Sequence, residues 1–324
     1  MAKKEQSYQV YLLKQKLVPY LFMLPNLIIF GLFIITPAIM GIYFSMTSFR
    51  GLGDSPEFIG LANYRALVSD EHFLAAMWNT IRLVLVTLPV VFIISLGLAV
   101  IISKPLRARG LYRAVYYWPV MISFIVAGLI GRWIFHDTRG YVNGLLTRIG
   151  DWGLWDMALF ELPLLNRINP GPIAILSDPT LAWWGVVLLF VWSRAGYYMI
   201  LFVAALLSVP PALYEAGKLD GANRVQRFFF ITYPSIKPAR TMVMILAAME
   251  IFKIFPHIVA FTGGGPILTG SRTGATLFQV QYIYEEAFTY RNLGGASAMS
   301  MVMILMVMTF TGAVLLMSRR GGEA

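Results

Sequence analysis

Six long apolar runs, each of 20 to 27 residues, constrain the fold of this chain more than any other feature of its sequence. A bilayer core about 30 Å thick is crossed by about 20 helical residues, so each run is long enough to span a membrane. A surface helix of a soluble protein would carry polar residues every few positions, and the run 302–308 carries none. We therefore predict an all-α integral membrane protein with six transmembrane helices, at 20–44, 80–102, 114–135, 181–207, 242–261 and 296–317.

Lysine and arginine are distributed unevenly among the segments that connect these runs. The two ends and the second and fourth connections carry 15 basic and four acidic residues, whereas the other three connections carry seven and eleven. Because basic residues are retained on the cytoplasmic side, both termini are predicted to be cytoplasmic. The net charge of +10 is then a sign of topology and of contact with membrane lipid, and no nucleic-acid partner is expected.

This topology predicts the domain organisation. Residues 1–19 form a cytoplasmic segment, 20–317 a single membrane domain, and 318–324 a cytoplasmic tail. Within the membrane domain, the outer connection 136–180 is long enough that it should fold over the outer face. Charged residues make up only 13% of the chain, against roughly 25% in an average soluble domain.

The sequence lacks the motifs of several kinds of chemistry. No GxxxxGK[ST] phosphate loop occurs, so the chain should not hydrolyse ATP itself. The three histidines are isolated, the sequence has no cysteine, and no GxSxG nucleophile elbow is present. We expect no enzyme activity, no catalytic residue, and no metal or cofactor bound by this chain.

The cytoplasmic connection 208–238 has the pattern of two short helices joined by a tight turn. The Pro210–Pro211 pair suits a helix start, where a missing N–H is not needed. Gly221 permits a turn with positive φ, and a second helical stretch should then run to Tyr233. Such a projection suits docking into a partner, although an ordinary amphipathic connection fits the same pattern.

The same connection carries a family motif. Its residues fit the pattern EAAxxDGAxxxxxFxxIxxPxxxP with every spacing kept, at Glu215, Ala216, Asp220, Gly221, Ala222, Phe228, Ile231, Pro234 and Pro238. The chain thereby resembles permease subunits of binding-protein-dependent carbohydrate importers of the ABC type, and is similar to the larger maltose permease subunit. It departs at Gly217, where the pattern has alanine and glycine costs about 1 kcal/mol of helix propensity. Segments 58–64, 109–113 and 262–266 also look like family features.

The resemblance implies a set of partners and a location. A second, homologous permease subunit, a cytoplasmic ATPase dimer that binds ATP and Mg²⁺, and an extracytoplasmic solute-binding protein that delivers an oligosaccharide would complete the importer in the bacterial inner membrane. The ATPase would dock on the motif residues Glu215, Ala216, Gly217, Asp220 and Gly221, with Glu215 paired to a basic residue of the ATPase.

Several polar residues lie inside the predicted spans, where a charge costs about 2.5–3.5 kcal/mol. Arg194 shares a helix face with Tyr197 and Tyr198, while Glu250 and Lys253 lie midway along the fifth span. The resemblance places Arg194 and Tyr197 at positions that line the sugar cavity, so these five residues are predicted to bind substrate. Pairing of Arg194 with Glu250 as a structural bridge is the alternative, and the two roles are compatible.

The basic residues of these spans suggest a substrate class. The planar guanidinium of Arg194 matches a carboxylate better than a neutral sugar. Lys253 and His257 lie on roughly one side of the fifth span. An acidic oligosaccharide, such as an alginate or other uronate fragment, is therefore our hypothesis for the substrate.

Two other functions compete with this interpretation. An ATP-independent secondary transporter or channel would use Glu250 for ion coupling, but the chain shows no inverted repeat with broken helices. A membrane glycosyltransferase would need paired acids. The candidates Asp70-Glu71 and Glu285-Glu286 both lie on the predicted outer side, away from a cytoplasmic sugar donor.

Overall fold

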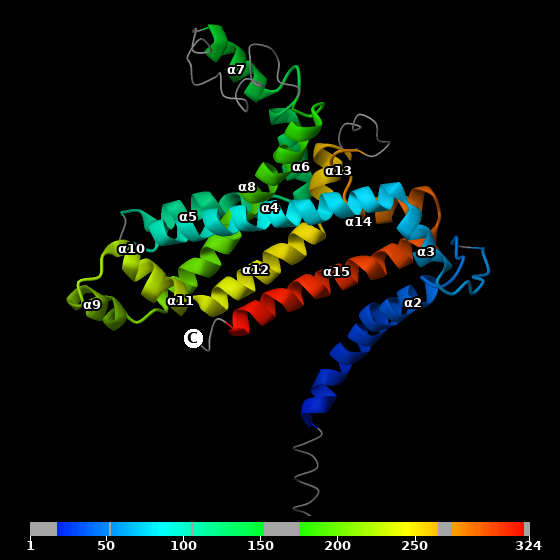
Figure 1. Cartoon of the computed structure of the whole chain (residues 1–324), viewed down its shortest axis with the longest axis horizontal. Coiled ribbons are helices and arrows are strands. Elements are labelled where there is room, and N and C mark those ends of the chain that lie inside the picture. Colours follow the sequence, from blue (N-terminus) through cyan, green and yellow to red (C-terminus); the bar gives the residue numbers. More distant parts are fainter. Residues whose placement is uncertain (1–17, 52, 105–106, 152–174, 265–273, 321–324) are drawn as a thin grey trace, which may run out of the picture. The chain divides into compact units, whose positions relative to one another are not determined.

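The computed structural model describes residues 18–51, 53–104, 107–151, 175–264 and 274–320. Within these ranges every regular element is helical (Figure 1), apart from one isolated bridge between Thr47 and Phe58, so the predicted all-α membrane fold is confirmed. The elements are η1 (Gly31–Ile35), α2 (Thr36–Phe44), α3 (Ala62–Ser69), α4 (Glu71–Ile102), α5 (Arg109–Tyr117), η2 (Trp118–Met121), α6 (Phe124–Ile134), α7 (Tyr141–Asp151), α8 (Pro179–Leu207), α9 (Pro211–Leu219), α10 (Arg224–Arg227), η6 (Phe228–Thr232), α11 (Tyr233–Ser235), α12 (Lys237–Phe252), α13 (Pro256–Phe261), α14 (Gln279–Tyr284), η7 (Glu285–Thr289) and α15 (Leu293–Arg320).

Four helices among the described residues are long and apolar enough to cross a membrane unaided. They are the continuous helix Val18–Phe44, which includes η1 and α2, together with α4, α8 and α15. A fifth span is formed if α5 and η2 are joined to α6, across a bend of 96°. The predicted fifth span is divided between α12 and α13. The exact number of six spans therefore stays a prediction, and the expectation of unbroken helices is wrong.

Both breaks have local causes in the sequence. After η2, Ile122 is extended, and Ser123 caps α6 by accepting a hydrogen bond from the Val126 N–H. In the other break, α12 ends at Phe252 and α13 begins at Pro256, whose ring disfavours a helical conformation in the preceding residue. Apolar composition predicts where the chain crosses the bilayer, but it does not predict whether the helix that crosses is continuous.

The chain forms two compact units, of which the first contains residues 1–67 and 286–302. Its loop after the first helix is held by Asn63, whose amide donates to the backbone oxygens of Ser45 and Thr47, each at 2.9 Å. The Tyr64 hydroxyl donates to Ser45 Oγ at 2.8 Å. A Cβ on Gly294 would lie 2.3 Å from the Thr47 oxygen, so only glycine permits α15 to begin there. The family-like segment 58–64 thus acts as a clamp on this loop.

The second unit contains residues 68–285 and 303–324 and is built on α4, α8 and α12. The C-terminal part of α15 packs on α12, where the rings of Phe252 and Phe310 are 5.8 Å apart. Helices α9, α10 and α11 form the end of this unit from which α12 starts, at the left of Figure 1. The fully buried side chains at its centre include Leu83, Val91, Tyr198, Phe202, Val243 and Ile251.

Two glycines allow backbones to approach closely in the second unit. A Cβ on Gly196 of α8 would lie 1.9 Å from the Tyr116 oxygen of α5. A Cβ on Gly128 of α6 would lie 2.7 Å from the Cβ of Ala260 in α13. Small residues at helix contacts are typical of membrane bundles, where close packing replaces the hydrophobic effect as the driving force.

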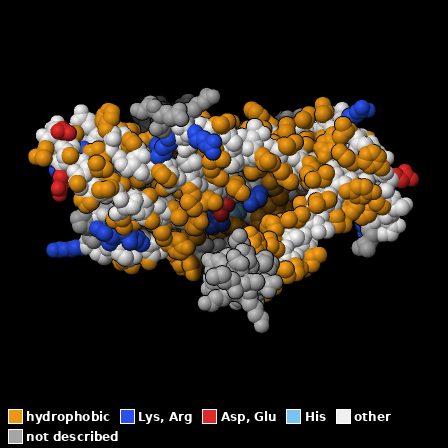
Figure 2. Space-filling view, turned by 90° about the horizontal axis from the view of Figure 1, so that it is seen from below, with side chains coloured by type: hydrophobic (Ala, Val, Ile, Leu, Met, Phe, Trp, Pro, Cys, Tyr) orange, Lys and Arg blue, Asp and Glu red, His pale blue; other side chains and the backbone are white. Residues whose placement is uncertain are grey.

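The surface is apolar, as contact with lipid requires. Figure 2 shows hydrophobic side chains over most of the visible face, with charged side chains in a few small groups. Phe22 and Phe33 of the first helix are 81% and 74% exposed. The predicted termini and most of the long outer connection, at 1–17, 152–174 and 321–324, lie outside the described residues.

Candidate functional site

The connection between α8 and α12 has the predicted helix–turn–helix backbone. Pro211 opens α9, which ends at Leu219 with Asp220 as its C-cap. Gly221 has φ +77°, as expected for the turn. The second helical stretch then runs from α10 through the π-helical η6 to α11, and it starts with a capping box between Asn223 and Gln226.

One face of α9 packs against η6. The hydroxyls of Tyr214 and Thr232 are hydrogen-bonded at 3.0 Å. Gly217 is buried on the same face, and a Cβ there would lie 2.7 Å from the terminal methyl of Ile231. The glycine that departs from the family pattern therefore has a packing role, and it supports α9 rather than offering a surface to a partner.

The opposite face of α9 is exposed. Glu215 and Ala216 lie on it together with Leu219, whose side chain is 89% exposed. Asp220 and Gly221, at the end of the helix, are exposed as well. No described residue forms an ion pair with Glu215. Four of the five predicted docking residues are thus accessible to a partner, and Gly217 is not.

Two predicted substrate residues meet in the interior of the second unit. Arg194 Nε of α8 and Glu250 Oε2 of α12 are 3.0 Å apart, and their side chains are 13% and 34% exposed. The contact is an ion pair rather than an aligned hydrogen bond, because Arg194 Nε has no hydrogen-bond acceptor in the described chain. The fully buried Tyr198 donates to the same carboxylate oxygen at 2.7 Å. The bridge between the two spans is therefore present.

Aromatic rings surround this ion pair. The Arg194 guanidinium lies 4.0 Å from the centre of the Phe124 ring, at the start of α6. Phe124 in turn packs at 4.1 Å against the ring of His257, whose nitrogens have no hydrogen-bond partner among the described residues. Tyr197 packs edge-on against Tyr198 at 5.3 Å. Sequence reasoning missed Phe124, because a phenylalanine in an apolar run carries no signal that sets it apart from its neighbours.

Lys253 is not part of this cluster. It is the exposed C-cap of α12, at the break before α13, and it forms no ion pair with a described residue. The structure thus brings Arg194, Tyr198 and Glu250 together and leaves Lys253 apart.

Three of the four acids considered for a glycosyltransferase form structural hydrogen bonds. Asp70 caps α4 and accepts a hydrogen bond from the Tyr282 hydroxyl at 2.8 Å. Glu285 accepts one from the Gln281 amide at 2.9 Å, and Glu286 accepts one from the side chain six residues later. These hydrogen bonds give Asp70, Glu285 and Glu286 structural contacts, which weakens this alternative.

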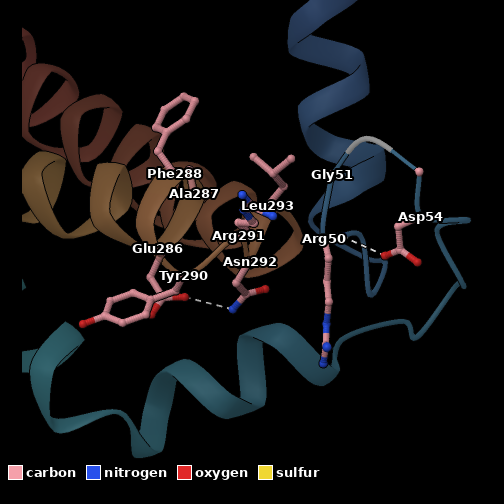
Figure 3. Close-up of a pocket in the computed structure, with 11 residues that line it drawn as sticks. Arg50, Gly51, Asp54, Glu286, Ala287, Phe288, Tyr290, Arg291, Asn292 and Leu293 are labelled. Atoms are coloured by element: carbon pink, nitrogen blue, oxygen red, sulfur yellow. Dashed lines mark hydrogen bonds between the residues drawn. The ribbon is translucent and has the colours of Figure 1, made fainter.

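The first unit contains a cavity of about 1300 Å³ (Figure 3), between loop 50–54 and segment 286–293. The Arg50 N–H donates to Asp54 at 3.0 Å on one wall, and Asn292 donates to Glu286 at 2.9 Å on the other. Arg291 has φ +55°, which is uncommon for a residue other than glycine. Sequence reasoning did not find this cavity, because its walls come from opposite ends of the chain.

Several known transport proteins are similar to this chain in sequence or in fold. The permease UgpA of the sn-glycerol-3-phosphate transport system of Yersinia pestis is 31% identical over 91% of each chain. The permease AmyD of the probable starch degradation products transport system of Thermoanaerobacterium thermosulfurigenes is 29% identical, over 95% of this chain and 94% of that one. A bacterial ABC transporter involved in the import of alginate has a similar fold, with a TM-score of 0.76 and 23% identity over 95% of this chain and 96% of that chain.

The family model gives the assignment. Residues 77–320 match the family described as the inner membrane component of binding-protein-dependent transport systems. The match covers well over half of the chain and includes α8, α9 and α12. The chain therefore belongs to the family of inner-membrane permease components of binding-protein-dependent ABC transport systems.

Proposed function

We propose that this chain is one of the two membrane subunits of an ATP-driven sugar importer, and that the exposed face of α9 carries its contact with the ATPase. This proposal rests on one observation, which is that one face of α9 is packed and the other is exposed. Tyr214 and Gly217 hold one face against η6, while Glu215 on the other face is exposed and has no ion-pair partner among the described residues. An anchored helix with a free acidic face suits transmission of a rigid-body motion.

The family supports the remaining partners. Its description as binding-protein-dependent implies a solute-binding protein outside the membrane, and the resemblance adds a second permease and an ATPase dimer. The relatives transport sn-glycerol-3-phosphate and starch degradation products, according to their names, so hydroxyl-rich substrates are the class we assign. The charge count supports cytoplasmic termini and a cytoplasmic α9.

Substitution of Glu215 tests the ATPase contact. Loss of one partner of an interfacial charge pair costs about 2–5 kcal/mol, so Glu215→Ala should lower sugar-stimulated ATP hydrolysis by more than about tenfold. The amount of the subunit in the membrane should not change. Glu57→Ala, an exposed acid on the predicted outer side, is the matched control and should be neutral. Normal hydrolysis and uptake in Glu215→Ala would remove the assigned role of this face.

We further infer that the Arg194–Glu250 pair contacts the sugar during transport. The pair is only partly buried, and Glu250 is 34% exposed, so hydroxyl groups can reach it. A pair of opposite charges suits a neutral sugar, whereas a uronate carboxylate would have to bind the Arg194 guanidinium beside the Glu250 carboxylate or in its place. The acidic-substrate hypothesis therefore requires the guanidinium either to hold a second carboxylate or to exchange Glu250 for it. Competition of neutral and uronate oligosaccharides for uptake by the wild-type importer distinguishes the two substrate classes.

Ion coupling through Glu250 has less support. The carboxylate is paired with Arg194 and accepts a hydrogen bond from the Tyr198 hydroxyl, which are the contacts of a bridge between two helices. Broken helices do occur in this chain, but they accompany membership of an ATP-dependent transporter family.

A further inference from the structure

A basic cavity of about 620 Å³ lies beside α9, on the face opposite Glu215. It is bounded by the last turns of α4 and α8 and by α9, α10 and η6. Lys104, Lys218, Arg224 and Arg227 line it, and no acidic residue is among its described lining residues. The remaining lining is apolar or hydroxyl-bearing. The cavity thus concentrates positive charge that the described chain does not neutralise.

Arg227, which lines the cavity, has a charged donor without an acceptor among the described residues. Its Nε is buried without a hydrogen-bond partner in the described part of the chain. An unpaired buried donor of a charged group is costly, and like charges around one cavity repel each other. A bound anion would both accept a hydrogen bond from the Arg227 Nε and reduce the repulsion among the basic side chains.

The position of the cavity indicates the source of that anion. Helices α4 and α8 have the length and composition of membrane spans, so their last turns lie at the level of the lipid headgroups. Leu207 lines the cavity and is 57% exposed, while Phe229 and Phe230 of the adjoining η6 are 56% and 79% exposed. Apolar exposed side chains next to a basic cavity match the acyl chains and headgroup of a lipid.

We propose that this cavity binds the phosphate headgroup of an anionic phospholipid from the cytoplasmic leaflet. The inference depends on the proposed orientation of the chain, but not on the substrate. The ATPase is the less favoured occupant, because Tyr214, which lines the cavity, holds its face of α9 against η6, whereas Glu215 and Leu219 lie on the exposed face. The lipid would then connect the membrane to the helix that is proposed to receive the ATPase.

Lipid retention by the intact importer tests the proposal. The complex is purified from membranes that contain phosphatidylglycerol, and native mass spectrometry measures the lipid that stays bound. The test variant is Lys104→Gln/Lys218→Gln/Arg224→Gln. Each basic residue near an anionic headgroup is worth about fivefold in affinity, so retention should fall by well over tenfold. Arg319→Gln, an exposed cation outside the cavity, is the control and should retain the lipid.

Two further measurements, together with the lipid retention itself, decide the outcome. The ATPase should copurify equally with wild type and with the triple variant, so its loss with unchanged lipid would assign the cavity to the ATPase and overturn the proposal. Inorganic phosphate should not displace the lipid from wild type, and displacement would indicate a site for a soluble anion instead. Equal lipid retention by wild type, the triple variant and Arg319→Gln would also overturn the proposal. A failed Glu215→Ala experiment leaves these results unaffected, because none of them depends on Glu215.

Discussion

Removal of the Arg194 guanidinium should destabilise the second unit and leave Glu250 without its counter-ion. The two side chains are 13% and 34% exposed. The loss should therefore lie between the about 0–1 kcal/mol of an exposed pair and the about 3–5 kcal/mol of breaking a buried one. We expect about 2 kcal/mol for Arg194→Ala, which lowers the ratio of folded to unfolded protein by about thirtyfold.

A double-mutant cycle separates the charge pair from other effects of the substitution. Glu250→Gln keeps an acceptor for the Tyr198 hydroxyl, which donates to the carboxylate at 2.7 Å. The variant Arg194→Ala/Glu250→Gln should therefore recover about 1 kcal/mol relative to the sum of the single changes. Tyr198→Phe removes a hydrogen bond to a charged group and should cost about 1.5–3 kcal/mol on its own.

Melting of the assembled importer, followed by size-exclusion chromatography, measures these stabilities, and uptake measures function. Recovered stability with full uptake would assign the pair a structural role only. Recovered stability without uptake is the result we expect if the guanidinium also contacts sugar. Additive effects of the two substitutions would refute the interaction itself, because residues that do not interact give independent losses.

Three further predictions concern packing and topology. Gly196→Ala should cost about 3 kcal/mol of stability or prevent assembly, because the added Cβ would lie 1.9 Å from a backbone oxygen that cannot move away. Gly97→Ala is the control, since its Cβ would have no neighbour within 4 Å, and it should be neutral or stabilising in the same melting assay. Asn63→Ala removes two hydrogen bonds from the loop after the first helix and should lower stability by about 2 kcal/mol, measured as earlier proteolysis of that loop. In a chain without cysteine, a cysteine at Arg224 should resist an impermeant thiol reagent in intact cells and one at Asp54 should react; the reverse pattern would invert the orientation.

The sequence predicts elements whose causes are local or set by the bilayer. The apolar runs predict four of the long helices, because the membrane sets their length and composition. The turn at Gly221 and the helix start at Pro211 follow from the backbone freedom of those two residue types. The breaks before α6 and α13 escaped prediction, since Ser123 and Pro256 stand in runs that are otherwise apolar enough to continue.

The residues of the candidate site could be predicted from the sequence, but their role could not. Arg194 and Glu250 were recognisable because charges inside a membrane are costly, but the sequence left binding and pairing equally open. Their contact depends on how α8 and α12 pack, which no local pattern encodes. The packing role of Gly217 depends likewise on Ile231, which reaches it only after the turn.

The close approach of α8 and α5 at Gly196 restricts how the second unit can move. With the Tyr116 oxygen where a Cβ would otherwise lie, the two helices cannot slide past each other without first separating. We therefore expect that α5 moves together with α8 when α9 displaces α8, so that α5 and α8 behave as one rigid body. We expect bending at the interruption after η2, where Ile122 is extended and intrahelical hydrogen bonds do not resist it.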